Sequence, residues 1–233
     1  MYLNPTFEYK HISEWIATLI NRQLTPRRFA HRLSSHLNKY HPIRVKLYLD
    51  TTILDAGDFT IGAEYDPELD ENGKKQFIIN LIVNHPKHMP MQITGDFADR
   101  FTIEMVEALV HEYQHQHQYR SRKHIMNRGY TSVHKDSKIK ADQEYLGQPD
   151  EIDAYAANIA ARFFLLKDKL NTIEPVESLD LKQYYLIFGP FHPVVKRLLK
   201  KIVTNTHYLK ENDNDKAYRR HSKRFRTVRG RRS

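Results

Sequence analysis

Two histidines stand four positions apart in the stretch His111-Glu112-Tyr113-Gln114-His115, with a carboxylate between them. On an α-helix, residues four apart lie on the same side, one turn above each other. His111 and His115 can therefore direct ring nitrogens to one cation. Glu112 is turned by roughly 100° and shifted about 1.5 Å along the axis, so it can reach a water on the metal without binding the metal itself. This spacing is typical of a hydrolytic metal site.

A histidine-rich helix surface is the alternative interpretation. The chain has 14 His, and the five-residue pattern arises by chance in roughly one such sequence in twenty. The residues around the pattern favour a metal site. Residues 97–120 place Phe101, Met105 and Leu109 at four-residue spacing, which predicts an amphipathic helix. That helix would follow an apolar strand directly and would carry the histidines well inside its length.

A third metal ligand must come from outside this stretch. Nearby candidates are His117, His124 and His134, or a carboxylate on another element. Glu151 is better placed, because Pro149 predicts the start of a helix over 150–166 and puts Glu151 in its first turn. The small side chains of Ala154 and Ala157 would let that helix approach the first one closely. The alternative is that Glu151 is an ordinary acid favouring a helix N-terminus.

The remaining patterns predict an α+β fold. Helices are expected at 11–22 and 26–40, the second opened by Thr25-Pro26, and at 181–188 and 193–204. Strands are expected at 44–50, 59–65 and 76–83, and the natural assembly of the three is a small antiparallel sheet. Residues 121–147 read as a long polar connection that is either functional or disordered.

Composition limits the compartment and the partners. The chain has no Cys, so any metal must be held by His, Asp or Glu; this suits a reducing cytosol. No run of eighteen apolar residues and no signal-peptide pattern is present, so we expect no membrane association.

The net charge of +9 comes entirely from the C-terminal segment, because residues 216–233 contain nine Lys or Arg and no acid. We expect 213–233 to be a disordered basic tail that binds nucleic acid through phosphate contacts. A solubilising tail, or one that docks on an acidic protein, is an equal alternative. The basic residues expected to contact nucleic acid are Arg219, Arg220, Lys223, Arg224, Arg226, Arg229, Arg231 and Arg232.

Residues 76–160 resemble the zincin metallopeptidases, specifically the gluzincin branch, in which a glutamate from a following helix joins the two motif histidines. The resemblance implies a zincin-like peptidase domain over 1–212, with Zn²⁺ on His111, His115 and Glu151 and with Glu112 as the base. Gluzincins carry Asp four residues after the glutamate ligand, where this chain has Tyr155. The metzincin pattern is excluded, since Gln118 and Ser121 stand where it requires Gly and His.

The segments 145–156 and 188–202 are also similar to metallopeptidase-like proteins of tailed bacteriophages. SprT-like proteases are a more distant comparison, with His134 as the only candidate for their third histidine. This resemblance implies a protein substrate, and a location in the host cytoplasm or in a virion.

The expected reaction is peptide hydrolysis, in which Glu112 accepts a proton from water and passes it to the leaving amine. The oxyanion needs a donor. Candidates are Tyr130, His134, Tyr145, Tyr155 and His192, and His192 is preferred because it lies in the break between two helices. Two other readings remain open: a non-catalytic virion or binding protein that keeps this fold, and a nucleic-acid-binding module whose histidines are incidental.

Overall fold

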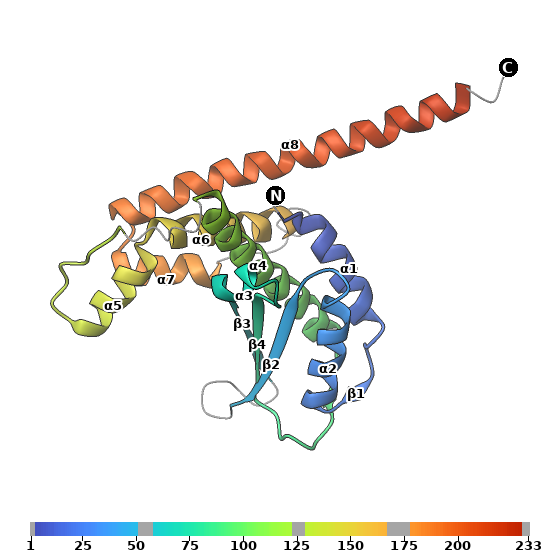
Figure 1. Ribbon diagram of the computed structural model, residues 1–233, viewed down its shortest axis with the longest axis horizontal. Helices are drawn as coiled ribbons and strands as arrows, with labels where there is room; N and C mark the ends of the chain where they lie inside the picture. The colour runs from blue at the N-terminus through green and yellow to red at the C-terminus, as the bar shows by residue number, and fades with distance from the viewer. Residues whose placement is uncertain (1–2, 51–57, 123–128, 167–177, 230–233) are drawn as a thin grey trace.

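The computed structural model describes residues 3–50, 58–122, 129–166 and 178–229, with no description of the side chains of 213–229. Within this part the chain is α+β and mostly helical, as predicted, with eight helices and two small sheets (Figure 1). The helices are α1 (Pro5–Ala17), α2 (Pro26–Leu37), α3 (Pro67–Glu71), α4 (Gly95–Ser121), α5 (Ser137–Leu146), α6 (Pro149–Leu166), α7 (Leu179–Phe188) and α8 (Pro193–Arg229). The strands are β1 (Gln23–Leu24), β2 (Ile43–Leu49), β3 (Phe59–Tyr65), β4 (Phe77–Val83) and β5 (Met91–Gln92).

The larger sheet is mixed. Its strand order is β2-β4-β3, with β4 antiparallel to β3 and parallel to β2. The prediction of an antiparallel sheet was therefore wrong for the β2–β4 pair. Strand β4 is buried on both faces along most of its length, which favours the central position. The consecutive strands β2 and β3 then flank it, and the reversal of the chain between them makes β2 run in the same direction as β4.

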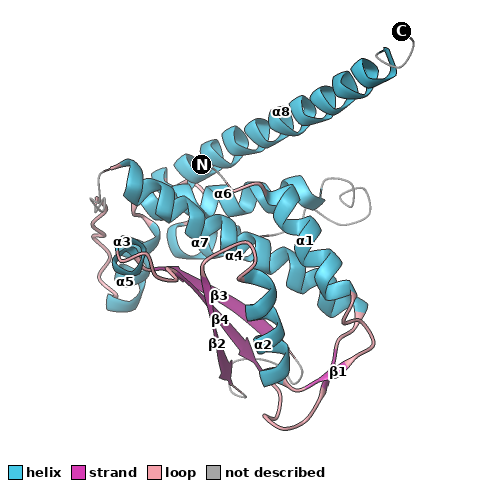
Figure 2. Ribbon diagram, turned by 45° about the vertical axis from the view of Figure 1, so that its right-hand side comes forward, coloured by secondary structure: helices cyan, strands magenta, loops and turns pink. Residues whose placement is uncertain are grey.

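The first hydrophobic core lies between the three-stranded sheet and helices α1, α2 and α4. Helix α2 packs along β2, and α4 packs along β3 (Figure 2). Phe101, Met105 and Leu109 of α4 are fully buried in this core. The helix predicted over 97–120 is confirmed, and the Thr94 hydroxyl caps it by accepting a hydrogen bond from the Phe97 N–H at 3.1 Å.

The second core joins α5, α6, α7 and α8. Ile152 and Ile159 of α6 are buried with Tyr184 of α7 and with Val195 and Leu198 of α8. Helix α6 also contributes to the first core and packs along α4. It is therefore held from both sides, which fixes its N-terminal turn against the C-terminal half of α4.

Several segments differ from the sequence predictions. The helix expected at 11–22 is α1, which begins and ends earlier, at Pro5 and Ala17. The polar connection at 121–147 contains helix α5, whose cap is Asp136: its carboxylate accepts hydrogen bonds from the N–H groups of Lys138 and Ile139, both at 2.9 Å. Helix α8 runs beyond 204 to Arg229 and projects from the body of the molecule (Figures 1 and 2). It passes through most of the residues assigned to the basic tail. None of the described helices is both long and apolar enough to span a membrane.

Candidate metal centre

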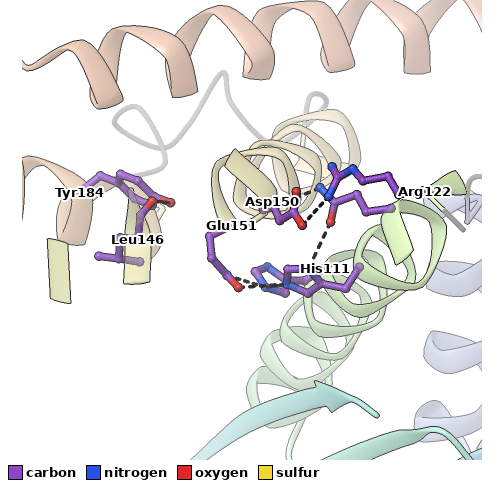
Figure 3. Close-up of polar contacts among 8 residues, drawn as sticks. His111, Arg122, Leu146, Asp150, Glu151 and Tyr184 are labelled. Carbon is purple, nitrogen blue, oxygen red and sulfur yellow. Dashed lines mark hydrogen bonds and ion pairs between the residues drawn. The ribbon is translucent and has the colours of Figure 1, made fainter. Parts of the chain in front are cut away.

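Helix α4 turns His111 and His115 toward α6 while its apolar face is fixed in the first core. His111 Nε2 and His115 Nε2 lie 3.1 Å apart. Glu151, in the first turn of α6, points toward the pair (Figure 3), with Oε2 3.5 Å from His111 Nε2 and Oε1 3.4 Å from His115 Nε2. The structure thus brings together the three residues predicted as metal ligands, and this group could hold a metal ion.

The two separations between Glu151 and the imidazoles match the edges of a metal coordination shell, whereas the two imidazole nitrogens lie about 0.2 Å closer together than such an edge. Ligand atoms at 2.0–2.2 Å from zinc in a tetrahedral arrangement are separated by about 3.3–3.6 Å. Good N–H···O hydrogen bonds are shorter, at about 2.9–3.0 Å. Two imidazole nitrogens and a carboxylate oxygen also form the set found at catalytic zinc sites that keep a fourth position open.

Hydrogen bonding alone leaves the group incompletely paired. His115 Nδ1 lies 3.2 Å from Gln118 Oε1, an acceptor, so Nδ1 carries the proton and Nε2 presents its lone pair to the site. Glu151 Oε2 is buried and has no hydrogen-bond partner among the described residues. A cation between the three side chains would satisfy all of these atoms.

The charges at the site favour a cation as well. Burial raises the pKa of Glu151, but the hydrogen bonds and charges of His111 and His115 outweigh it and lower the pKa to about 2. Burial lowers the pKa of His115, and Glu151 more than offsets it, so that this pKa is raised. The carboxylate is therefore ionised at neutral pH and attracts positive charge, supplied by a proton or by a metal ion.

Polar contacts at the end of α4 hold the N-terminal turn of α6 in place. The Gln118 side chain donates through Nε2 to the Asp150 carbonyl at 3.1 Å while its oxygen faces His115. Arg122 donates through Nη1 to Asp150 Oδ2 at 2.6 Å (Figure 3). Because Glu151 follows Asp150 directly, these contacts set the position of the carboxylate ligand relative to the imidazoles.

Glu112 lies beside the three ligands and is buried, with 6% of its surface exposed. Its carboxylate accepts a hydrogen bond from the backbone N–H of Tyr65, at the end of β3. Burial raises its pKa, and the charges of His111 and His115 lower it by less. A raised pKa makes this carboxyl group a better proton acceptor, which suits proton transfer.

Aromatic side chains surround the ligands. The Tyr155 ring meets the His111 ring edge-on, with centroids 4.6 Å apart, at the position where gluzincins carry Asp. Tyr145, on the unpredicted helix α5, is half exposed and hydrogen bonds to Glu151. Tyr145 could not be preferred among the five oxyanion candidates from the sequence alone, because its position depends on a mostly polar helix without a clear hydrophobic periodicity.

His192 lies at the start of α8. Its Nδ1 accepts a hydrogen bond from the Val194 N–H at 3.2 Å, and its ring packs against Phe188, with centroids 4.9 Å apart. Its contacts in the described part of the chain do not include the three ligands. The structure therefore gives His192 a helix-capping position, and its predicted catalytic role stays a prediction.

Other predicted site residues lie elsewhere. The ring nitrogen Nδ1 of His134 accepts from the Asp136 N–H at 3.1 Å, outside the metal group, and His124 is outside the described residues. Of the basic residues expected to contact nucleic acid, those up to Arg229 lie on the part of α8 described by its backbone alone, and Arg231 and Arg232 lie beyond it.

Comparison of the chain with protein-family models, with curated proteins and with solved structures returned no match.

Proposed function

We propose that the protein is a zinc-dependent peptidase that hydrolyses peptide bonds in protein substrates. The observation that carries this proposal is the convergence of His111, His115 and Glu151 at separations typical of metal ligands, with the Glu112 carboxylate beside them. A helix-borne histidine pair with an adjacent glutamate and a glutamate ligand from a following helix is the arrangement implied by the gluzincin resemblance. We therefore propose a zincin-like fold for the domain.

A zinc ion bound by these three residues would supply Lewis acidity, which lowers the pKa of water and polarises a carbonyl oxygen. Glu112 then accepts the proton of the attacking water and delivers it to the leaving amine. Its hydrogen bond from the Tyr65 N–H keeps the carboxylate oriented during both transfers.

Tyr145 is the better candidate for stabilising the oxyanion. Its hydrogen bond to Glu151 places the phenol at the ligands, and it is half exposed. An O–H donor at this position could turn toward a developing negative charge on the substrate. We assign it this role in place of His192, whose contacts are with the start of α8.

The position of strand β3 at the edge of the sheet supports the proposed peptidase function. In the described residues this strand pairs with β4 on one side alone. At the other edge the Phe59 carbonyl accepts from Arg100 Nη2 at 2.6 Å, so an extended peptide would pair with the main-chain groups in the middle of that edge. The Tyr65 N–H at its end contacts Glu112, which connects this edge to the proton-transferring group.

Variants of Glu112 and His111 distinguish metal binding from catalysis. Glu112→Gln should keep about one zinc per chain at this site, measured by mass spectrometry of the metal, while cleavage of an unfolded protein substrate falls by at least about 10²-fold. His111→Ala should lose that zinc. Glu14→Gln, an exposed acid on α1, serves as the matched control and should change neither. Cleavage by Glu112→Gln at the parental rate would contradict the role given to Glu112.

A second candidate function is favoured by the burial of the site. His111 and Glu112 are only 8% and 6% exposed, which suits a metal that stabilises the fold of a non-catalytic virion or binding protein. In that case zinc would be present and lost in His111→Ala, but no variant of Glu112 would change the fate of any protein substrate.

A further inference from the structure

A second group of ligand-type side chains, which shares no residue with the proposed catalytic site, lies where α1 meets the segment before β2. Glu8 and His11 come from α1, and His41 precedes β2. Glu8 Oε2 lies 2.7 Å from His11 Nε2 and 2.8 Å from His41 Nε2. All three residues are buried, with exposures of 2%, 7% and 6%. One carboxylate oxygen and two inward-facing ring nitrogens therefore converge in the protein interior.

The outer nitrogens of both imidazoles are also engaged. His11 Nδ1 lies 3.1 Å from His36 Nε2, and His41 Nδ1 lies 2.7 Å from the Tyr113 hydroxyl. Metal-binding histidines almost always use the nitrogen that does not bind the metal in such a hydrogen bond, which fixes the orientation of the ring. The two Nε2 atoms are held facing Glu8 in this way.

Among the described residues, the ion pairs of the buried Glu8 carboxylate involve no Lys or Arg. Glu8 is paired with His11 and His41, and a buried carboxylate without a full positive partner is costly. Its surroundings therefore favour a cation.

We propose that Glu8, His11 and His41 form a second site for a divalent cation of the zinc type, with a structural role. The site would join α1 and the segment before β2 to α4, through Tyr113. It would hold the N-terminal helices against the helix that carries His111, and it does not depend on the proposed peptidase function.

The distances predict that this second site binds more weakly than the first. The separations of 2.7 and 2.8 Å are those of hydrogen bonds and are about 0.5 Å shorter than the edges of a tetrahedral zinc shell. A cation must therefore displace the ring protons and move the three side chains apart. At the first site only the two imidazoles must separate, by about 0.2 Å, because the distances from Glu151 already fit.

The experiment uses the full chain with both histidines of the first site replaced, His111→Ala and His115→Ala. After equilibration with excess zinc and gel filtration, the folded double variant should keep about one zinc per chain, and cobalt should give the visible absorption of a tetrahedral site. Adding Glu8→Gln should abolish both signals, whereas Glu14→Gln on the same helix should not. Circular dichroism reports whether each variant is folded.

A folded double variant that holds no zinc and gives no cobalt spectrum would overturn the proposal, and the cluster would then be a hydrogen-bonded network. Zinc retained after Glu8→Gln would overturn it as well, because the metal would be bound elsewhere. If the double variant does not fold, Glu151→Gln replaces it, and loss of the more weakly held zinc on adding Glu8→Gln is the supporting result. None of these outcomes depends on peptide cleavage.

Discussion

Glu107 should make the stability of the protein fall as the pH rises. It lies one turn before His111 on α4, is 8% exposed, and accepts a hydrogen bond through Oε2 from Arg162 Nη1 at 2.8 Å. Burial raises its pKa from 4.5 to about 8 in spite of Arg162. At pH values between these two pKa values, Glu107 keeps its proton in the folded protein and has lost it in the unfolded chain. Each rise in pH over this range therefore lowers the free energy of unfolding.

The size of the effect follows from the pKa values. The difference between 4.5 and about 8 corresponds to roughly 3 to 5 kcal/mol at about 1.4 kcal/mol per pKa unit. Glu107→Gln keeps the size of the side chain and an oxygen for Arg162 but cannot ionise. We expect the variant to match the parent near pH 5 and to be more stable by several kcal/mol at pH 8.

The measurement is urea unfolding monitored by circular dichroism at pH 5, 6, 7 and 8, with the same zinc content in every sample. Groups that have no charge interaction with Glu107 titrate equally in both proteins, so their contribution cancels in the difference between the two curves. Asp180 and Glu104 interact with Glu107 and also contribute to that difference. Glu14→Gln, at an exposed position, should give the parental pH dependence. Parallel curves for the parent and Glu107→Gln would show that Glu107 is ionised in the folded protein, which would refute the reasoning.

Three further predictions test other parts of the structure. Tyr184→Phe should lower the free energy of unfolding by about 1–2 kcal/mol, measured by calorimetry, because the buried hydroxyl donates to the Leu146 carbonyl at 2.9 Å (Figure 3). Arg122→Met should cost about 2–3 kcal/mol and weaken zinc binding in a chelator competition, since it removes the guanidinium that pairs with Asp150 beside the ligand turn. Deleting 216–233 should weaken DNA binding and remove most of its salt dependence, measured by fluorescence anisotropy at several salt concentrations; unchanged binding would contradict a role for the tail.

The grouping of the metal ligands could be predicted because each signal is local. The helical spacing of His111 and His115 needs no tertiary information, and Pro149 marks the turn that contains Glu151. The small residues of α6, with Ala154 fully buried, are consistent with the predicted close approach of the two helices.

Features that depend on long-range packing could not be predicted in the same way. Strand direction depends on which strand takes the centre of the sheet, and the apolar pattern of 77–83 indicates burial without indicating direction. Glu8, His11 and His41 are separated by up to 33 positions and meet only through the packing of α1 against the rest of the first core. Helix α5 has only Leu146 buried, so it has almost no hydrophobic periodicity to detect.

The length of α8 sets a distance between two parts of the molecule. At about 1.5 Å per residue, the 37 residues of the helix extend over roughly 55 Å, and those after Leu209, the last residue that lines the cavity against α4 and α6, account for roughly 30 Å of it. A macromolecule bound near the C-terminal end of α8 would thus be held away from His111. The helix would act as a spacer that sets how far apart two bound partners can be.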